Sequence, residues 1–101
     1  MHNWQGGIRV NAFVSGGWLA KAAPRMVGTK LDGLVSIADY YATCAALAGV
    51  DPTDHRAAAA GLPPIDSLNM VPYLTGQAAE SPRTFIFNDV NTAVVRRSAT
   101  L

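Results

Sequence analysis

The sequence is poor in cysteine and in charge. Cys44 is the only cysteine, which excludes an internal disulfide and a zinc site built from several cysteines. Charged residues make up 15% of the 101 residues and the formal net charge is +1, so neither a nucleic-acid partner nor a polybasic membrane patch is predicted. No apolar run reaches the ~18 residues of a membrane span, and Met1 to Gly7 is not expected to act as a signal peptide.

Motifs for phosphate binding and for a serine nucleophile are also missing. Gly6-Gly7 and Gly16-Gly17 form neither a G-x-G-x-x-G nor a Walker pattern. Ser15 lies in Val-Ser-Gly-Gly and not in Gly-x-Ser-x-Gly, so a nucleophile elbow is not supported. Arg96-Arg97 is interpreted as a pair of exposed charges at the end of a strand. With half of its residues hydrophobic, the chain is nevertheless expected to fold as one globular domain.

Histidines and aspartates do not form a metal-ligand pattern. His2 and His55 are far apart, and neither has a helical histidine partner, so both are predicted to be surface histidines. Asp51, Asp54 and His55 are close in sequence but lack the alternating oxygen ligands and central glycine of a calcium loop. We interpret them as a solvated turn.

The N-terminal part has the pattern of a strand followed by a connection. Apolar residues alternate from Ile8 to Val14, which predicts a strand that ends at Gly16-Gly17. Phe13 lies among the polar residues of the other side, so both faces of the sheet are expected to be covered. Trp18 to Gly28 is expected to be irregular, and Leu34-Val35 to be a very short extended piece.

The pattern predicts a helix from Ser36 to Ala48. Ser36 and Asp39 have the spacing of a capping box with Asp in place of Glu, and Gly49 is placed to end the helix in a left-handed conformation. An apolar stripe recurs at three- and four-residue steps and consists of Ile37, Tyr40, Tyr41, Cys44, Leu47 and Ala48. Because Cys44 lies on this stripe, we expect it to be a small buried hydrophobic residue.

The second half of the chain is predicted to contain short elements. Asp51 to Asp66 reads as a long loop with one helical turn at Ala57 to Ala60. A short helix is expected from Ser67, as N-cap, to Leu74, shortened or distorted by Pro72. After a polar connection over Gln77 to Arg83, the expected strands and turn are Thr84 to Phe87, Thr92 to Val95, and a turn that begins at Asn88-Asp89.

Three blocks of sequence in the same order resemble a known family. The blocks are WQGGIRVNAFVSGG, GTKLDGLVSIADYYATCAALAGVDP and IDSLNMVPYLTG, followed by SPRTFIFND. Together they resemble the later part of the sulfatase family, in particular arylsulfatases of the arylsulfatase B type. The matching residues are Trp4, Gly6, Gly7, Ile8, Arg9, Val10, Ala12, Phe13, Asp32, Gly33, Asp39, Tyr41, Leu47, Gly49, Asp51, Pro52, Asp66, Leu68, Pro72, Leu74 and Gly76. Gln5 and Asn11 depart from the family's usual Glu and Pro.

The resemblance implies an α/β fold that is part of an alkaline-phosphatase-like (sulfatase) fold. Residues 1–82 would belong to the C-terminal part of the catalytic domain, including the last part of its main sheet. Residues 83–101 would begin the small C-terminal antiparallel subdomain. The parent enzyme would hydrolyse sulfate esters, and its family is often secreted or lysosomal.

The resemblance places the family's catalytic parts outside this chain. Calcium and a formylglycine are expected in the full-length parent, but Cys44 precedes Ala45-Ala46-Leu47 and not the Pro and Arg of Cys-x-Pro-x-Arg. The sulfate-binding lysine would fall before Met1. The chain alone is therefore expected to be inactive, with no catalytic residue and no metal ligand, and with His2 and Trp4 at the edge of the substrate cleft.

Two alternatives stay open for the function. The chain could be a non-catalytic structural or binding remnant, or a piece of a phosphatase or phosphodiesterase of the same superfold, since a fold does not select the ester. The isolated chain is expected to self-associate, because a strand such as Ile8 to Val14 exposes pairing edges when its neighbours are missing.

Overall fold

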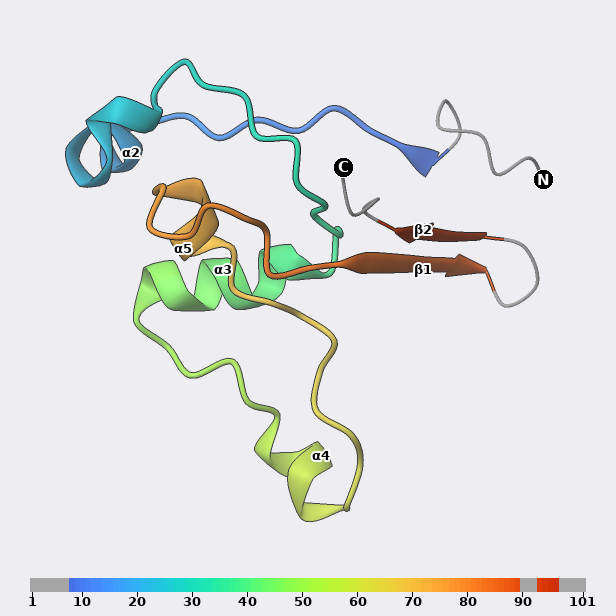
Figure 1. The fold of residues 1–101 in the computed structure, drawn as a ribbon. Coiled ribbons are helices and arrows are strands. Elements are labelled where there is room, and N and C mark those ends of the chain that lie inside the picture. The colour runs from blue at the N-terminus through green and yellow to red at the C-terminus, as the bar shows by residue number, and fades with distance from the viewer. Residues whose placement is uncertain (1–7, 90–92, 97–101) are drawn as a thin grey trace.

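The computed structural model describes residues 8–89 and 93–96. It contains short helices and one hairpin (Figure 1). The elements are α2 (Gly17–Ala22), the 3-10 helix η1 (Pro24–Met26), α3 (Asp39–Ala48), α4 (His55–Ala59), α5 (Val71–Leu74), β1 (Phe85–Asp89) and β2 (Ala93–Arg96). In Figure 1, α5 lies over α3, the loop with α4 extends away from them, and the hairpin projects to one side.

Helix α3 begins at Asp39 and not at Ser36, and its N-cap is Ala38 without a side-chain cap hydrogen bond, so the predicted capping box is formed only in part. The Asp39 carboxylate accepts a hydrogen bond from the Ser36 N–H over 2.8 Å, as the acidic residue of a capping box does, but the Ser36 hydroxyl accepts from the Ala38 N–H over 3.3 Å. At the other end Gly49 has a φ of 71°, and the Val50 N–H donates to the Ala45 carbonyl oxygen over 2.9 Å. The predicted helix and its glycine cap are confirmed.

The side of α3 that faces the rest of the chain is not the apolar stripe. The buried residues of α3 are Asp39, Ala42 and Thr43. The stripe lies on the other side, and its exposed members are Ile37, Tyr40, Tyr41, Cys44, Leu47 and Ala48. The prediction that Cys44 is buried is therefore wrong. The reason is that α3 docks through hydrogen bonds to the segment before α5, and these bonds require the polar side of the helix to face inward.

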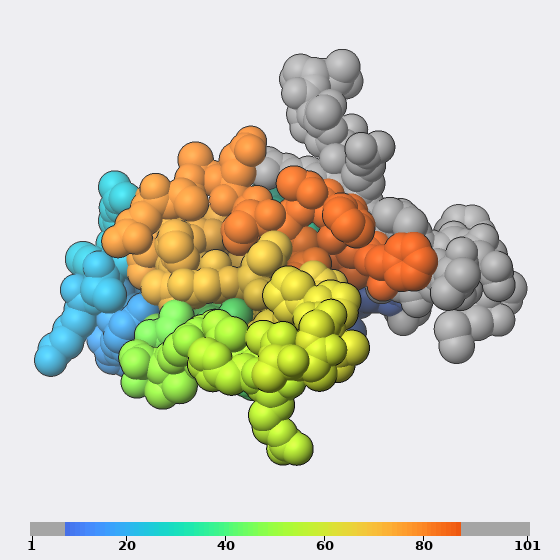
Figure 2. Space-filling model, turned by 90° about the horizontal axis from the view of Figure 1, so that it is seen from below, coloured from blue at the N-terminus to red at the C-terminus, as the bar shows by residue number. Residues whose placement is uncertain are grey.

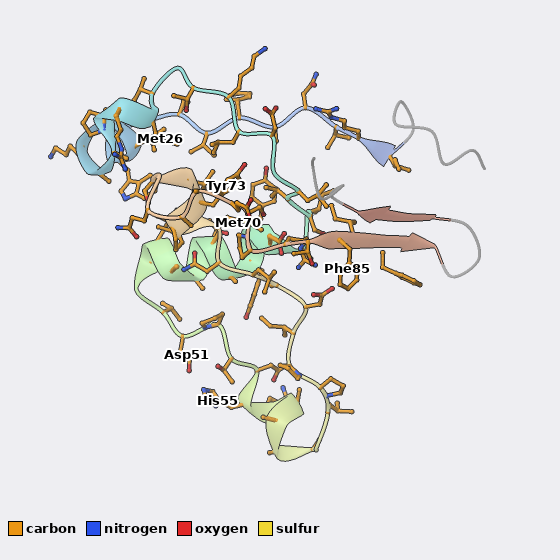
Figure 3. All side chains as sticks on the ribbon, in the orientation of Figure 1. Met26, Asp51, His55, Met70, Tyr73 and Phe85 are labelled. Carbon is orange, nitrogen blue, oxygen red and sulfur yellow. The ribbon has the colours of Figure 1, made fainter. Side chains whose placement is uncertain are left out.

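The hydrophobic core is small and lies between α2, α3 and α5. Its buried members are Leu19, Ala23, Ala42, Met70 and Tyr73. Figure 3 shows Met70 and Tyr73 at the centre of the molecule, where α5 approaches α3. The Tyr73 hydroxyl accepts a hydrogen bond from the Gly33 N–H over 2.7 Å, which fixes the segment before α3 against α5.

The N-terminal predictions need correction. Residues 9–15 form neither helix nor strand, so the expected strand over Ile8 to Val14 is wrong. No strand in the described part of the chain pairs with this segment, and Phe13 is 88% exposed, so the expectation of a sheet covered on both faces is also wrong here. Trp18 to Gly28 contains α2 and η1 in place of an irregular connection, with Pro24 at the start of η1, where proline is tolerated. Leu34-Val35 forms no strand.

The elements of the second half are shorter than predicted. The helical turn inside the long loop is confirmed as α4, which Asp54 caps by accepting from the Ala57 N–H over 3.0 Å. Helix α5 begins at Val71 and not near Ser67, since Pro72 occupies the first turn, where no intrahelical N–H is needed. Ser67 is therefore not its N-cap.

The C-terminal hairpin confirms the two predicted strands. β1 pairs antiparallel with β2 in the register Phe85 with Arg96 and Phe87 with Val94, and the register shifts between Phe87 and Asp89. Asn88 and Asp89 lie in β1, so the predicted turn does not begin there. This hairpin is the only sheet among the described residues. The larger main sheet that the sulfatase resemblance implied is not found among them. The alkaline-phosphatase-like fold stays a prediction.

Gly33 offers a test of the core packing. A Cβ built on Gly33 would lie 2.6 Å from the Tyr73 hydroxyl oxygen and 2.7 Å from the Ser81 Cβ. Because Tyr73 is buried and its hydroxyl is hydrogen-bonded to the Gly33 N–H, we expect Gly33→Ala to lower the free energy of unfolding by about 1–3 kcal/mol. Gly17→Ala is the matched control, because nothing lies within 4 Å of its added Cβ. Urea denaturation followed by circular dichroism measures both, and equal midpoints would contradict this packing.

Candidate functional site

The most strongly built polar site is a buried ion pair between Asp39 and Arg83. The Asp39 side chain at the start of α3 is 0% exposed, and the Arg83 side chain just before β1 is 7% exposed. The two residues are 44 positions apart in the sequence. We call Asp39, Asp66 and Arg83, with the backbone that binds them, the Asp39–Arg83 cluster.

Arg83 and Asp39 form a bidentate ion pair. Arg83 Nε donates to Asp39 Oδ2 over 2.7 Å, and Arg83 Nη2 donates to Asp39 Oδ1 over 2.6 Å. The same carboxylate accepts from the backbone N–H of Ser36 over 2.8 Å and of Leu68 over 3.0 Å. Each carboxylate oxygen thus has two donors. Such a charge-assisted, bidentate pair fixes both position and orientation.

The electrostatics of the site keep both groups charged. Burial by itself would raise the pKa of Asp39, but the hydrogen bond and charge of Arg83 and the N–H groups of Ser36 and Leu68 outweigh burial and lower that pKa. The hydrogen bond to Asp39 raises the pKa of Arg83 against the opposing effect of burial. An ion pair that is satisfied in this way can persist away from water.

Asp66 closes the cluster on the solvent side. Arg83 Nη2 donates to Asp66 Oδ1 over 3.2 Å and to the Asp66 carbonyl oxygen over 3.3 Å. The Asp66 side chain is 88% exposed, so this contact is a surface ion pair of small energetic value. Its role is to hold the start of the segment that leads to α5.

That segment is fastened to α3 by further side-chain hydrogen bonds. The Ser67 hydroxyl donates to the Ala38 carbonyl oxygen over 2.6 Å and accepts from the Ala42 N–H over 2.9 Å. The Thr43 hydroxyl accepts from the Met70 N–H over 3.0 Å. Ser67, Leu68 and Met70 are thus each bound to α3, and no buried side-chain polar atom among the described residues lacks a partner.

The geometry of the cluster supports a structural role and not a catalytic one. A general base needs a free lone pair within reach of a substrate proton, and a nucleophile needs access to the substrate. Asp39 has neither, because its oxygens are occupied by Arg83 and two backbone N–H groups and its side chain is buried. The cluster fixes the relative position of α3, the segment before α5 and the start of β1.

The turn that includes Asp51 and His55 is a second polar group. His55 Nε2 lies 3.5 Å from Asp51 Oδ2, and both side chains are exposed (Figure 3). Hydrogen bonds from Thr53 lower the pKa of Asp51, with a further contribution from His55. The prediction that these residues are solvated, with His55 on the surface, is confirmed, but the predicted turn is wrong in part, because His55 begins α4 and Asp54 caps that helix.

A shallow groove of about 560 Å³ lies between α2, η1 and α5. Its lining consists of Trp18, Ala22, Ala23, Pro24, Arg25, Val71, Thr75 and Gln77. Arg25 Nη2 donates to the Gly76 carbonyl oxygen over 3.2 Å, and the Thr75 hydroxyl donates to the Val71 carbonyl oxygen over 2.8 Å. Arg25 is the only charged residue in the lining, so the groove has no pair of groups for acid–base chemistry.

The two residues predicted at the edge of a substrate cleft, His2 and Trp4, lie outside the described residues. The structure brings together Asp39, which the sequence pattern places in a capping box, and Asp66, which is predicted only as a match to a family. Ser67 binds α3 and does not cap α5 as predicted, and the role of Arg83 was not predicted. Local spacing gives no signal for Arg83, because its partner is 44 positions away.

Comparison with known proteins identifies neither a fold nor an activity for this chain. No protein-family model matches the chain, and no curated protein and no solved structure matches it either. None of the helices in the described part of the chain has the length and apolar character needed to cross a membrane.

The groups that the sulfatase resemblance implies can be compared with the donors present. Calcium needs six to eight oxygen ligands, and residues 8–89 and 93–96 contain no group of three or more potential ligands that could hold a metal ion. Cys44 is exposed but lacks the modification motif. The described residues therefore do not fit calcium or formylglycine, and no chemical step is assigned to either group in this chain.

Removing the charge of Asp39 tests how much the Asp39–Arg83 ion pair contributes to the stability of the fold. In Asp39→Asn the buried Arg83 guanidinium loses its buried counter-charge and keeps only the exposed carboxylate of Asp66, so we expect the free energy of unfolding to fall by about 3 kcal/mol. Asp32→Asn, at an exposed position seven residues earlier, is the control and should change it by no more than about 0.5 kcal/mol. Urea denaturation measures both variants. Similar midpoints for the two would show that the ion pair does not hold the fold together.

The ion pair also predicts a dependence on pH. Because the pKa of Asp39 is lowered on folding, the unfolded chain binds the proton first, and the ion pair contributes its full stability above the unfolded value of about 3.9. That contribution is lost as the pH falls from about 4 through the lower folded pKa. Thermal melts between pH 7 and pH 2 should show a steeper loss for the wild type than for Asp39→Asn. Parallel curves would argue against this assignment.

Proposed function

We propose that this chain is the later part of a sulfatase catalytic domain of the arylsulfatase type, within an enzyme that hydrolyses sulfate esters. In this proposal residues 1–82 complete the catalytic domain and residues 83–101 begin the small C-terminal subdomain. The chain supplies scaffold, and the catalytic groups, the calcium and the formylglycine belong to the rest of the enzyme. The chain by itself is inactive.

The observation that carries the proposal is the Asp39–Arg83 cluster. Asp39 lies in the second family-like block, Leu68 in the third, and Arg83 in the SPRTFIFND segment that follows. These three residues meet through hydrogen bonds of 2.6–3.0 Å. Support for the proposal comes from this convergence, because blocks that resembled the family by chance would have no reason to meet at one buried carboxylate.

The exposed apolar residues give further support. In the described residues, large hydrophobic side chains that lie on the surface outnumber those that are buried. Val10 and Phe13 from the first block and Tyr41 and Leu47 from α3 are among them. Surfaces of this kind mark interaction sites. We infer that they pack against the rest of the enzyme, and that the isolated chain covers them by self-association.

The same surface supports a second candidate, a non-catalytic binding or structural module. Such a module would fold and bind a partner without any contribution to ester hydrolysis. A phosphatase or phosphodiesterase of the same superfold is the other alternative, because the scaffold does not select the ester.

A chimera separates these functions. The region of an arylsulfatase B-type enzyme that corresponds to Trp4–Leu101 is replaced by this chain, and hydrolysis of an aryl sulfate is measured. We expect sulfate release well above background, with the host's formylglycine intact by mass spectrometry. Asp39→Asn in the chimera should lower the yield of active enzyme, while Asp32→Asn should not. The isolated chain with added calcium should release no sulfate.

Three outcomes would count against the proposal. A chimera that expresses as soluble, formylglycine-containing protein but hydrolyses no sulfate ester would show that this scaffold does not complete a sulfatase. Sulfate release by the isolated chain would show that the chain is itself the enzyme. Hydrolysis of aryl phosphate by the isolated chain would favour the phosphatase branch.

A further inference from the structure

The groove between α2, η1 and α5 contains one positive charge, the guanidinium of Arg25. Arg25 Nη2 donates to the Gly76 carbonyl oxygen over 3.2 Å. A Cβ built on Gly76 would lie 3.2 Å from Nη2 and 3.5 Å from Nε, so these two atoms lie against the Gly76 backbone. In Figure 2 the blue residues of α2 lie at one edge of the molecule, next to the orange residues around α5. Arg25 therefore connects the two sides of the groove, and this contact positions its guanidinium.

One edge of this guanidinium is open to a ligand. Arginine has five N–H donors, arranged as two forked edges that share Nη2. Because Nε and Nη2 lie nearest Gly76, the edge formed by Nη1 and Nη2 points away from that glycine. No ion pair that the described residues form among themselves includes Arg25. The groove thus presents a positive charge on a fork that matches the two oxygens of a carboxylate.

The charge around Arg25 has one sign. Residues 8–31, which form the α2 and η1 side of the groove, contain four cationic side chains and no Asp or Glu. The four are Arg9, Lys21, Arg25 and Lys30. The opposite side of the groove consists of the uncharged residues Val71, Thr75 and Gln77. Charge complementarity therefore favours an anion in this groove.

The rest of the lining suits an aromatic ring. Trp18 is 39% exposed at the groove, and a ring can stack on its indole in an offset arrangement. Further apolar surface comes from Ala22, Ala23, Pro24 and Val71. The Thr75 hydroxyl already donates to the Val71 carbonyl oxygen, so the lining offers one charged group beside a mostly apolar surface.

From this lining we infer that the groove binds a small aromatic carboxylate, with the carboxylate on the Nη1–Nη2 edge of Arg25 and the ring against Trp18. Benzoate is flat, because its carboxylate lies in the plane of its ring, and a flat ligand fits a shallow groove. One negative charge balances one guanidinium, whereas an aryl phosphate with a charge near −2 would leave one charge unpaired. The inference goes beyond the proposed function, which names other surface residues.

The shape of the groove sets the expected affinity. Its volume of about 560 Å³ lies within the roughly 300–1,000 Å³ of small-molecule sites. Because the groove is shallow, one side of the ligand stays in water and contributes little to binding. We therefore expect a Kd of about 0.1–10 mM for benzoate.

Tryptophan fluorescence tests the site. Trp4 and Trp18 are the two tryptophans of the chain, so in Trp4→Phe the emission reports the groove alone. Benzoate at constant ionic strength should give a saturable change in that emission. Acetate, which lacks the ring, and benzyl alcohol, which lacks the charge, should each bind about tenfold or more weakly than benzoate. Phenyl phosphate at pH 8 should also bind more weakly.

Two pairs of variants, each made in the Trp4→Phe chain, locate the ligand. Arg25→Gln should weaken benzoate binding about tenfold or more, while Lys30→Gln, outside the lining, should change the Kd by less than about twofold. Ala22→Phe fills the groove and should abolish saturable binding, while Ala20→Phe, in α2 but outside the lining, should not. Circular dichroism should show similar unfolding midpoints for all four, because the four positions are exposed.

Four results would overturn the inference: no saturable change with benzoate up to about 50 mM, equal binding of benzyl alcohol and benzoate, tighter binding of phenyl phosphate, or equal weakening by Arg25→Gln and Lys30→Gln. These failures differ from a failure of the proposed function. The chimera measures sulfate release by the catalytic groups of the host enzyme, so either test can fail while the other succeeds.

Discussion

The buried ion pair between Asp39 and Arg83 is the constraint on which the rest of the described structure depends. A charged carboxylate in the interior is costly unless every oxygen has a donor, and Asp39 obtains its donors from three separate parts of the chain. Satisfying that one group therefore requires the start of α3, the segment at Leu68 and the residue before β1 to occupy fixed positions. The small apolar core around Met70 and Tyr73 forms within that frame.

The same constraint explains why the apolar stripe of α3 is exposed. A helix has a single orientation relative to its neighbours, and the orientation that pairs Asp39 with Arg83 turns Tyr41, Cys44 and Leu47 to the opposite side. A buried ion pair is weak evidence for stability but can specify one arrangement among several. Here that arrangement leaves the apolar stripe of α3 exposed.

Residues from the blocks that resemble the sulfatase family meet at the Asp39–Arg83 cluster, and every buried side-chain polar atom among the described residues has a hydrogen-bond partner. Under the proposed function, a scaffold of this kind would contribute to catalysis by holding its elements in position.

Local patterns in the sequence determined the helix at α3, its glycine cap, the turn of α4 and the two strands of the hairpin, because these depend on neighbouring residues. Sequence patterns alone could not determine which side of α3 is buried, since Arg83 is 44 positions from Asp39 and hydrogen bonding overrode the apolar period. They also predicted a strand at Ile8 to Val14, which the structure does not form, because a strand requires a neighbour and alternation alone does not supply one. Tertiary contacts decided which side of α3 faces solvent, because the buried Asp39 carboxylate needs hydrogen-bond donors from distant segments and only one orientation of the helix supplies them.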